Sequence, residues 1–540
     1  IQEGCGDVAV IGSGYSYLRE FMPPVASGVL KSGWATMIGM GRGAFAYPDF
    51  ARDILREGGM DRMKTCIACS CCTQIMRDGG TAGCVIRDSE VYGPIFRKGR
   101  AQARDRIVAE AERCRTCAAP TCQAACPAGV DVPGFVSAVA SGEFRKAYDV
   151  LRESNPLPEL CAYICPVAEQ CEGSCIEATI SGQAVPIRDI QRFVSRMARE
   201  QGWARLRIPD EGTGRQIAVI GAGPAGLACA AKLLEMGHAV TVYEQGGRPG
   251  GVGRETIPSD RLDAADVEHE LRVMLSQTDT ERFRWKFNMS LGSEIMLDDL
   301  LLDSGYDAVF LGIGLSESVP LHDSAKPPEG VETALAFLRR IKDDPHAEMP
   351  ERVAVLGGGN TAMDAAATAR RHGARDVYVV YRRSFAEMPA WPEEREAALT
   401  EGVHFLILTQ PVGYQADAEG RLRGVHTVRT VLGPEDDSGR RRPVTVPGSN
   451  ALLEVDLAIE ALGQRPAPGL VELLPGVELN ERGFIKIDPL TARTSKEGVY
   501  AGGDITGGDF TAVSAVAEGV LAARSIDGSL SSAPAGPVGV

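Results

Sequence analysis

The sequence predicts a multidomain α/β protein in which a helical, cysteine-rich region separates a short βα segment from two Rossmann-like domains. Three observations support this prediction. Short β-branched runs end in glycine turns and lead into helices, which is the pattern of parallel sheets. Two of these turns carry glycine fingerprints of dinucleotide-binding domains. Thirteen of the 15 cysteines lie between residues 66 and 175.

Composition narrows the class of protein. The chain has 540 residues, which at roughly 150 residues per domain predicts three or four domains. Its 57 basic and 72 acidic residues give a formal charge of −15, which argues against a nucleic-acid partner, because such a partner needs a basic face. No apolar stretch approaches about 18 residues, so we expect no membrane span. The start has no leader pattern and no Met, so we expect a fragment or processed product that is cytoplasmic, with reduced thiols.

The first predicted element is a βα segment at residues 1–62. Strand-like runs at 7–11 and 35–38 each end in a glycine-rich turn, and a helix is expected between them. This alternation predicts parallel strands. A complete (β/α)8 barrel needs about 250 residues, so the segment holds only a few units of such a fold.

Residues 63–100 carry the first group of cysteines. Thiolates are soft ligands, and four of them suit a [4Fe-4S] cluster or a zinc ion. Five cysteines compete for four positions. We favour Cys66, Cys69, Cys72 and Cys84, because a single residue separates Cys69 from Cys71. An iron–sulfur cluster is the preferred interpretation, and zinc is the alternative.

Residues 101–210 are expected to be helical and carry eight more cysteines, which are Cys114, Cys117, Cys122, Cys126, Cys161, Cys165, Cys171 and Cys175. Cys126 and Cys165 each precede a proline, a pairing found in bacterial cluster sequences. Two zinc ribbons would pair one CxxC with another, and this region has no second CxxC. The spacing favours two [4Fe-4S] clusters. Cys5 and Cys229 are expected to be ordinary packing residues.

A dinucleotide-binding unit begins in residues 211–320. A strand leads into Gly221, Gly223 and Gly226 and then into a helix. The first glycine allows the turn, the second lets the backbone approach a pyrophosphate, and the third permits close packing of the helix on the strand. Glu244 ends the next strand, about 20 residues on, where a ribose hydroxyl needs an acceptor.

Residues 321–454 carry a second fingerprint, whose candidate binding residues are Gly357, Gly359, Asn360 and Thr361. The next strand ends in Arg382 and Arg383, where the first unit has an acid. Guanidinium groups at that position favour a 2′-phosphate, hence NADP over NAD. The alternative is an arginine pair that is simply solvated at the end of a strand.

Residues 455–526 return to strands and then form a helix from about 511 to 525. Asp504 follows a strand, where a carboxylate can hold flavin ribityl or phosphate hydroxyls. Thr511 and Ala512 open the helix, whose N-terminus can stabilise negative charge on a reduced isoalloxazine. The alternative is a helix packed on the sheet without a ligand. Residues 527–540 are rich in Ser, Pro, Gly and Ala and are expected to be disordered.

These motifs give residues 105–526 a resemblance to the small (β) subunit of glutamate synthase and to the N-terminal half of dihydropyrimidine dehydrogenase. Gly250-Gly251, residues 357–364 and residues 501–504 belong to the same pattern. The resemblance implies a helical domain with two [4Fe-4S] clusters and an FAD domain, with Gly251 in its site, interrupted by an NADP domain. It also implies one cluster on Cys114, Cys117, Cys122 and Cys175, and another on Cys126, Cys161, Cys165 and Cys171.

Residues 1–97 resemble the end of the FMN barrel of the old yellow enzyme family, in the iron–sulfur branch with 2,4-dienoyl-CoA reductase and trimethylamine dehydrogenase. The motifs that carry this resemblance are residues 39–42, residues 47–50 and the spacing of the first cysteine group. It implies a partial (β/α)8-barrel end, in which Gly14, Gly41 and Arg42 contact an FMN phosphate. The earlier barrel strands, which would bear the substrate residues, are not among these residues.

Together these resemblances predict an oxidoreductase that passes electrons from NADPH through FAD and [4Fe-4S] clusters to an FMN barrel, where an organic acceptor with an activated double bond is reduced. An alternative is an electron-transfer subunit that feeds a separate catalytic partner. A third interpretation is a zinc-stabilised scaffold or regulatory binding module. No residue is nominated as a general acid or base, because hydride transfer depends more on orientation than on proton transfer.

Overall fold

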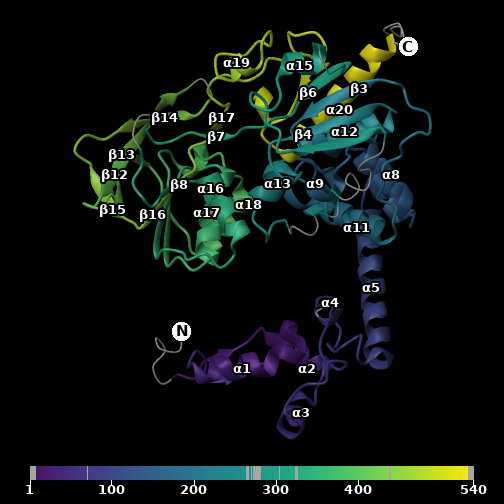
Figure 1. Ribbon diagram of the computed structural model, residues 1–540, viewed down its shortest axis with the longest axis vertical. Helices are drawn as coiled ribbons and strands as arrows, with labels where there is room; N and C mark the ends of the chain where they lie inside the picture. The colour runs from purple at the N-terminus through teal and green to yellow at the C-terminus, as the bar shows by residue number, and fades with distance from the viewer. Residues whose placement is uncertain are drawn as a thin grey trace. The chain divides into compact units, whose positions relative to one another are not determined.

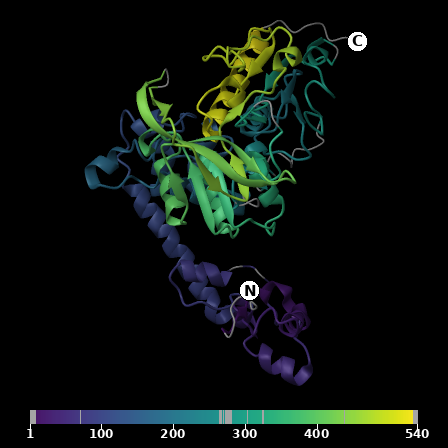
Figure 2. The same cartoon turned by 90° about the vertical axis from the view of Figure 1, so that its left-hand side faces the viewer.

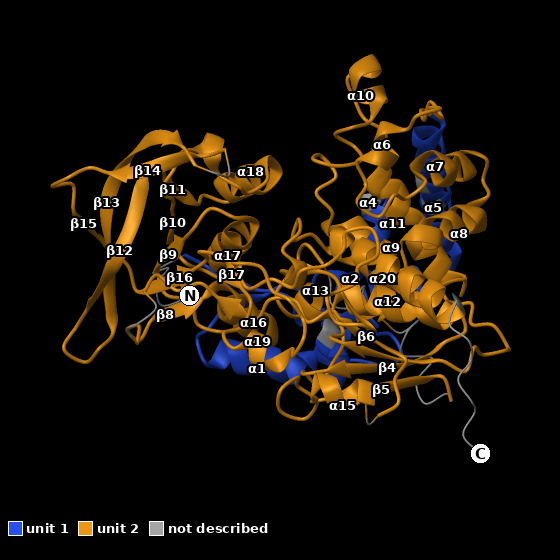
Figure 3. Ribbon diagram, turned by 90° about the horizontal axis from the view of Figure 1, so that it is seen from above, with its two compact units in different colours: residues 1–112 blue, residues 113–540 orange. Residues whose placement is uncertain are grey.

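The computed structural model describes residues 8–67, 69, 71–262, 267–268, 270–271, 281–302, 304–322, 326–436 and 439–532. The chain forms two compact units, residues 1–112 and residues 113–540 (Figure 3). Cys5, expected to be a packing residue, lies outside the described residues. In the described part of the chain, no helix is both long and apolar enough to cross a membrane.

The first unit contains a short parallel pair of strands followed by helices, and Figure 1 labels the helices of this unit. Strand β1 (Ile11–Gly12) pairs with β2 (Met37–Ile38), and η2 (Tyr15–Phe21) and α1 (Met22–Lys31) lie between them in sequence. The remaining helices are α2 (Arg42–Ala46), α3 (Phe50–Glu57), α4 (Cys71–Arg77) and α5 (Ser89–Glu112). The expected βα alternation is therefore present, although each strand is only two residues long.

Helix α5 crosses the domain boundary expected at residue 100, and the first unit ends at Glu112 instead. The reason is local. Residues 100–112 contain no glycine or proline and are rich in Ala, Arg and Glu, which are strong helix formers.

The second unit begins with a helical region that carries the eight cysteines of the second and third groups. Its helices are α6 (Thr121–Ala124), α7 (Val132–Ala140), α8 (Phe144–Ser154), α9 (Pro158–Ile164), α10 (Ile176–Ser181) and α11 (Ile187–Glu200). Asp131 caps α7, because its side chain accepts a hydrogen bond from the Gly134 amide (2.9 Å). Helix α11 buries Ile187, Ile190, Val194 and Ala198 on one face, as an amphipathic helix does.

Five parallel strands form the first Rossmann-like sheet, in the order β18-β6-β3-β4-β5. They are β3 (Gln216–Ile220), β4 (Ala239–Glu244), β5 (Phe283–Phe287), β6 (Ala308–Leu311) and β18 (Val499–Ala501). Helices α12 (Pro224–Glu235) and α20 (Ala512–Ser532) pack together beside this sheet (Figure 1). Their contact needs Gly519, because a Cβ there would collide with the carbonyl of Ala225.

A second parallel sheet has the order β11-β10-β9-β16-β8. Its strands are β8 (Val331–Thr333), β9 (Arg352–Leu356), β10 (Asp376–Val380), β11 (His404–Leu406) and β16 (Leu457–Glu460), and its helices are α16 (Ala334–Asp343), α17 (Asn360–Arg371) and α18 (Pro392–Thr400). Beside it lies an antiparallel layer (Figure 2), formed by β12 (Thr409–Ala416), β13 (Leu422–Glu435), β14 (Arg441–Thr445) and β15 (Ala451–Glu454).

The second sheet is inserted in the first domain through an antiparallel pair of strands. Strand β7 (Glu317–Ser318) pairs with β17 (Gln464–Arg465). The insertion was expected to end at residue 454, but β16 lies between β9 and β8, so the second sheet extends to Glu460. All residues of β16 are buried, and an apolar run without alternation does not reveal which sheet it joins.

The remaining short helices are α13 (Gly251–Glu255), α15 (Leu297–Leu302), η3 (Phe385–Glu387), α19 (Leu470–Leu473) and η4 (Asp504–Thr506). Helix α20 continues to Ser532, so residues 527–532 are helical rather than disordered as expected. Side-chain contacts fix this last part: Asp527 Oδ1 lies 3.0 Å from His238 Nε2, and Ser529 Oγ lies 2.9 Å from the Tyr500 hydroxyl. Residues 533–540 lie outside the described residues.

Candidate functional site

A cavity of about 580 Å³ in the second unit brings together residues from three parts of the chain. Residues predicted from the first dinucleotide fingerprint, from the second fingerprint and from the C-terminal helix line it, and these are Gly221, Gly223, Glu244, Gly251, Asn360, Thr361, Asp504, Thr511 and Ala512. Cys165 and Pro166 of the helical region line it as well. Gly226, Gly357, Gly359, Arg382 and Arg383 do not line it.

The turn from β3 into α12 has the form expected of a pyrophosphate cradle. Gly221 has a φ of +97°, which favours glycine, and a Cβ on Gly226 would collide with the Gly221 carbonyl. In contrast, a Cβ built on Gly223 would meet nothing within 4 Å. The backbone of Gly223 therefore borders open space at the N-terminus of α12, where amide groups can bind a phosphate.

Glu244 lies at the end of β4 and is held by two backbone amides. Its Oε2 accepts from Ala222 N (2.8 Å), and its Oε1 accepts from Gly246 N (2.7 Å). Each carboxylate oxygen can accept a further hydrogen bond. The carboxylate thus borders the cavity in a fixed orientation, and it fits the role of acceptor for a ribose hydroxyl.

Asp504 borders the cavity from the C-terminal part of the same domain. Burial, and secondly the neighbouring Glu518 carboxylate, raise the pKa of Asp504 to about 6. Glu518 is itself fixed, because its Oε2 accepts from Gly503 N (2.7 Å) and from the Thr506 hydroxyl (3.0 Å). Thr511 caps α20 by accepting from Ser514 N (3.2 Å). A polar acid and a helix N-terminus therefore face one end of the cavity, as FAD binding requires.

The second fingerprint opens α17. A Cβ on Gly357 would collide with the carbonyl of Ala461, whereas Gly359 faces open space. Asn360 Oδ1 accepts from Trp391 N (2.9 Å), which links the fingerprint to the start of α18. Like the turn between β3 and α12, this turn has one glycine that is tightly packed and one that faces open space. It therefore fits a second dinucleotide.

The two arginines after β10 differ from each other. Arg383 is buried, its Nη2 donates to Asp436 Oδ2 (2.6 Å) and its Nε donates to the Arg441 carbonyl (2.7 Å). Arg382 is exposed, and among the described residues no hydrogen bond or ion pair to its guanidinium is found. Arg382, rather than the pair, is therefore the cation available to a ligand at this strand end.

Cys126, Cys161, Cys165 and Cys171 line one hollow in the helical region. Burial, followed by the neighbouring Glu172 and Cys126, raises the pKa of the Cys171 thiol to about 12. No disulfide joins the cysteines in the described part of the chain. Four thiols around one hollow are a donor set that fits a [4Fe-4S] cluster.

Cys114, Cys117, Cys122 and Cys175 form a second neighbourhood. Burial is the main cause that raises the pKa of Cys122, to about 11, with further contributions from Cys175 and Cys114. Burial also raises the pKa of Cys114, with Cys175 and Cys117 contributing. Cys114, Cys122 and Cys175 therefore lie near one another, which is compatible with the grouping that the family resemblance implied, although Cys122 also contributes to the raised pKa of Cys171.

In the described residues, no three His, Cys, Asp or Glu side chains converge as ligands of a single metal ion do. A [4Fe-4S] cluster does not require such convergence, because each of its four thiolates binds a different iron atom. The two cysteine neighbourhoods are therefore compatible with cubane clusters.

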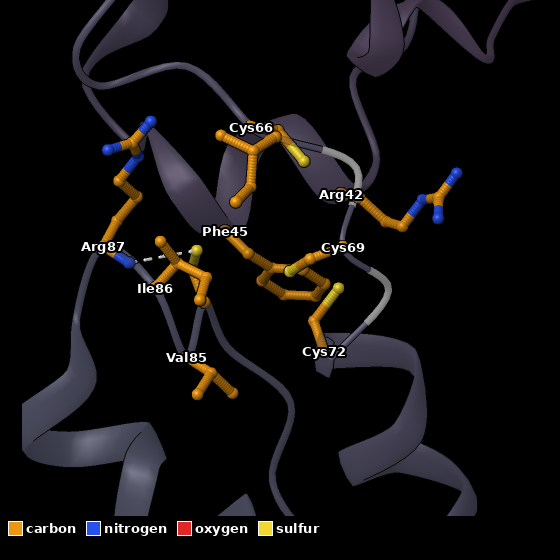
Figure 4. A pocket seen from close by; sticks show the side chains of 10 residues that line it. Arg42, Phe45, Cys66, Cys69, Cys72, Val85, Ile86 and Arg87 are labelled. Carbon is orange, nitrogen blue, oxygen red and sulfur yellow. Dashed lines mark hydrogen bonds between the residues drawn. The ribbon is translucent and has the colours of Figure 1, made fainter. Parts of the chain in front are cut away.

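The first unit holds a third group of thiols. Cys66, Cys69, Cys72 and Cys84 line a small hollow with Phe45, and Cys71 does not line it (Figure 4). The Arg87 amide donates to Cys84 Sγ (3.4 Å), the dashed line in Figure 4. Arg42 lines the same hollow. Four thiols and a backbone donor to one of them fit a cluster as well.

Gly14 and Gly41 follow the two strands of the first unit. Because β1 and β2 are parallel, the loops after them lie at one edge of the pair. A Cβ built on either glycine would meet nothing within 4 Å. The amide groups of these loops can therefore approach a phosphate, as the family resemblance implied for FMN.

The sequence analysis did not identify several residues of the large cavity. Gly312 follows β6, and a Cβ there would crowd Phe310 and the Gly226 amide; the sequence signal was its place in Leu311-Gly312-Ile313-Gly314. Arg261 binds Asp364 Oδ1 (2.6 Å) and lies 2.8 Å from Glu394 Oε1. Glu394 lines a neighbouring cavity rather than this one, and burial raises its pKa to about 7. No local pattern joins these three charges, since Asp364 and Glu394 both lie more than a hundred residues from Arg261 in sequence.

Two protein families match the chain. The family described as pyridine nucleotide-disulphide oxidoreductase matches residues 215–519. The family described as dihydropyrimidine dehydrogenase domain II, 4Fe-4S cluster, matches residues 96–203. The two matches together cover the cysteine-rich region and both Rossmann-like domains.

Curated relatives match most of the same region. The chain is 37% identical over 452 residues to the glutamate synthase [NADPH] small chain of Escherichia coli K12, which covers 81% of this chain and 93% of that one. It is 36% identical over 430 residues to the NADP(+)-dependent formate dehydrogenase subunit beta of Moorella thermoacetica, covering 75% of this chain and 59% of that one. Among solved structures, FprA of Mycobacterium tuberculosis with NADPH matches with 19% identity and a TM-score of 0.46, over 60% of this chain and 87% of that chain.

Proposed function

The chain belongs to the pyridine nucleotide-disulphide oxidoreductase family and carries a 4Fe-4S domain of the dihydropyrimidine dehydrogenase type, and from this membership we propose that its second unit supplies electrons from NADPH, through FAD, to two [4Fe-4S] clusters. It is a pyridine-nucleotide-dependent flavin and iron–sulfur oxidoreductase. We propose in addition which cysteines bind the clusters, that NADP is preferred over NAD, and which acceptor receives the electrons.

One observation carries the proposal. The cavity of about 580 Å³ is bordered by the open glycine of the first fingerprint, by Asn360 and Thr361 of the second, and by Cys165. A chain that transfers electrons between two dinucleotides and a metal cluster must hold all three close together, because the transfer depends on proximity and orientation. This arrangement favours an electron-transfer enzyme over a scaffold that keeps a dinucleotide for structure alone.

Different residues of the cavity bind different parts of FAD. Gly223 and the N-terminus of α12 bind the pyrophosphate of FAD, Glu244 accepts from a ribose hydroxyl, and Asp504 binds a polar group of the flavin chain. The N-terminus of α20, at Thr511 and Ala512, offsets negative charge near the flavin ring. When bound, FAD accepts a hydride and releases electrons singly, and [4Fe-4S] clusters carry single electrons.

The two cysteine neighbourhoods hold the clusters in this proposal, one on Cys114, Cys117, Cys122 and Cys175, and the other on Cys126, Cys161, Cys165 and Cys171. The family pairing supports this division, as does the one hollow that Cys126, Cys161, Cys165 and Cys171 line. Asn360 and Thr361 orient NADPH, and Arg382 binds its 2′-phosphate.

The test is anaerobic purification followed by assays of flavin, iron and acid-labile sulfide. We expect one FAD, roughly four iron atoms per cluster site, and NADPH oxidation with a dye as acceptor. Cys126→Ser is expected to remove the iron of one cluster, whereas Cys229→Ser, a buried thiol within the core of α12, leaves the iron content unchanged. Protein with zinc in place of iron and no NADPH oxidation would contradict the proposal and favour a zinc-stabilised scaffold.

We further propose that residues 1–62 are the last βα units of an FMN-type barrel and that Cys66, Cys69, Cys72 and Cys84 hold a third cluster that serves it. The parallel pairing of β1 with β2 supports this. Large apolar side chains of the first unit are exposed, among them Trp34 (71%) and Leu55 (87%), and exposed apolar surface of this kind is typical of a region that other protein covers. The acceptor would then be an activated double bond, as in an ene-reductase.

The experiment for this part is to read the gene upstream of the codon for Ile1 and to measure FMN in the full gene product. We expect six further βα units and one FMN per polypeptide. The second candidate is an electron-transfer subunit for a separate catalytic partner, which the 93% coverage of a glutamate synthase small chain favours. A gene product that lacks such units and lacks FMN would support this second candidate.

A further inference from the structure

We propose that Arg188 raises the reduction potential of the cluster held by Cys126, Cys161, Cys165 and Cys171, by donating a charge-assisted hydrogen bond to a sulfur atom of that cluster. The inference rests on the proposed function, because it requires a cluster at these four thiols. Arg188 is the second residue of α11 (Ile187–Glu200). It lines the hollow that the four cysteines line.

The lining of this hollow singles out Arg188. Most of the residues around the thiols are apolar or neutral, such as Val132, Val167, Ile187 and Val513. Among the described residues that line the hollow, Arg188 has the one ionised side chain apart from the thiols. An arginine keeps its proton at all physiological pH values, so this positive charge is permanent. In surroundings of low polarity its effect on a neighbouring charge is large.

One N–H donor of the Arg188 guanidinium group has no acceptor among the described residues. Its Nη2 donates to the carbonyl of Cys165 (3.1 Å), which fixes the group beside the cluster ligands. Its Nε is buried and has no hydrogen-bond partner in the described part of the chain. A buried, charged donor without a partner is destabilising, so this N–H indicates an acceptor that the described residues do not supply. The sulfur atoms of a cluster are acceptors of that kind.

The carboxylates near Arg188 neutralise it only weakly. Glu172 accepts from the backbone amide of Arg188 (2.8 Å) rather than from the guanidinium. Glu393 Oε2 lies 3.7 Å from Nη2, and the Glu393 side chain is 58% exposed, so water screens this pair. At the other cysteine neighbourhood the corresponding cation, Arg115, is bound to Glu177 at 2.6 Å and 3.3 Å. The guanidinium of Arg115 is therefore bound directly by a carboxylate, whereas that of Arg188 is not, although the Glu172 carboxylate lies near Cys171.

The position of Arg188 is unfavourable for the helix itself. A cation in the first turn faces the positive end of the helix dipole, where an acid is preferred. Packing of α11 does not require the charge, because Ile187 and Ile190 supply its buried face. A role toward the cluster accounts for a residue that the helix alone does not favour.

The electron balance of this step is simple. One electron that arrives at the cluster adds one negative charge beside Arg188; no bond breaks and no proton moves, because the guanidinium remains protonated throughout. The cation stabilises the more negative, reduced form and so raises the reduction potential, which hydrogen bonds to sulfur and net charge are known to set. Since Cys165 also lines the large cavity, the tuned cluster is the one whose ligand borders the proposed flavin site.

The test is a redox titration of the anaerobically purified full chain, followed by the EPR signals of the reduced clusters. In Arg188→Met we expect one cluster to become at least about tenfold harder to reduce, which is a fall of about 59 mV for a one-electron couple, while the other clusters change less than about twofold. Arg188→Lys keeps the charge and is expected to recover at least half of that shift. Arg192→Gln is the control: it removes a charge from the same helix, at a residue that does not line the hollow.

Each outcome decides the question. Unchanged potentials in Arg188→Met, an equal shift of all clusters, or an equal shift in Arg192→Gln would overturn the inference. If Arg188→Met loses its iron, Arg188→Gln and Arg188→Lys are measured instead, and loss of iron in all three variants would assign Arg188 a structural role and reject tuning. A wild-type protein without iron or an EPR signal would refute the proposed function itself, and the two failures are thereby distinguishable.

Discussion

At the scale of single residues, the two arginines after β10 carry opposite roles although they are adjacent in sequence. Arg382 is exposed and Arg383 is buried against Asp436. The side chains of neighbouring residues in an extended segment point to opposite sides of the backbone. One arginine therefore remains available to a ligand, and the other holds the strand end to the antiparallel layer.

Arg382→Ala is expected to raise the KM for NADPH by about 10- to 100-fold, because a charge-assisted hydrogen bond to a phosphate contributes about 1.5–3 kcal/mol. The KM for NADH should change less than about twofold, since NADH lacks the 2′-phosphate. Steady-state kinetics with a dye acceptor measure both. Arg383→Ala is the comparison: it removes the ion pair between Arg383 and Asp436 and is expected to lower the melting temperature. Equal losses for the two nucleotides in Arg382→Ala would remove the assignment of NADP.

Asp504 predicts a pH dependence of stability. Its pKa is raised from 3.8 to about 6 in the folded protein, so the folded state retains a proton that the unfolded chain releases. Stability therefore falls as the pH rises from about 4 to about 6, by up to about 3 kcal/mol for two pKa units. Asp504→Asn removes this penalty.

Flavin-free Asp504→Asn protein is expected to be more stable than the wild type at pH 7 by about 2–3 kcal/mol. The difference should vanish below about pH 3, where the aspartate is protonated in both states. Urea unfolding of the flavin-free proteins at the two pH values measures it. A difference that stays the same at both pH values would show that the substitution acts through something other than ionisation.

At the scale of elements, different glycines of the turn between β3 and α12 serve packing and ligand binding. Gly226 is needed for packing, because a Cβ there collides with the Gly221 carbonyl, whereas Gly223 faces open space and has ordinary backbone angles (φ −77°, ψ −177°). The same fingerprint thus contains one glycine required by the fold and one required by the ligand.

Two alanine substitutions in this turn are expected to have different effects. Gly226→Ala overpacks the contact of helix and strand and should destabilise the flavin-free protein by about 1–3 kcal/mol. Gly223→Ala should leave the melting temperature of the flavin-free protein unchanged and weaken FAD binding by about tenfold or more, because its methyl group occupies the space that a pyrophosphate needs. Differential scanning calorimetry and FAD titration separate the two. A Gly223→Ala protein with wild-type FAD affinity would contradict the location of the pyrophosphate.

How much the sequence revealed depended on the distance along the chain between the interacting residues. The fingerprint glycines and Glu244 were predictable, because they act within one strand–turn–helix–strand unit. The pairing of Arg383 with Asp436 and the pairing of Arg261 with Asp364 and Glu394 were not, because the partners lie about 50 to more than 100 residues from the arginine. The strand at residues 457–460 was assigned to the wrong sheet for a related reason: its apolar residues are buried on both faces, and periodicity does not identify the neighbouring strands.

At the scale of the whole molecule, the division at Glu112 separates two units that differ in how much of their apolar surface is buried. Residues 113–540 form a compact unit whose sheets have large buried cores. Residues 1–112 form the first unit, which has many exposed apolar side chains. Residues 113–540 satisfy the condition for independent folding, whereas residues 1–112 do not bury enough apolar surface to do so well.

Residues 113–540 expressed alone are therefore expected to fold and to bind FAD with the same stoichiometry as the full chain. The rate of NADPH oxidation with a dye should stay within about twofold of the full chain, while the iron content falls by the share of one of three clusters. Residues 1–112 expressed alone are expected to aggregate, because their apolar side chains remain exposed. A truncated protein without flavin would contradict the independence of the larger unit.

The antiparallel pair of β7 and β17 has one more consequence. The chain leaves the first Rossmann-like domain and returns to it at adjacent points, where Ser318 pairs with Gln464 and the Val319 amide donates to the Gly463 carbonyl (3.0 Å). A domain attached through two neighbouring strands can be exchanged as a unit by protein engineering. Replacing the segment between these junctions with its counterpart from an NADH-specific relative would exchange the electron donor while the flavin and cluster regions keep their own sequence.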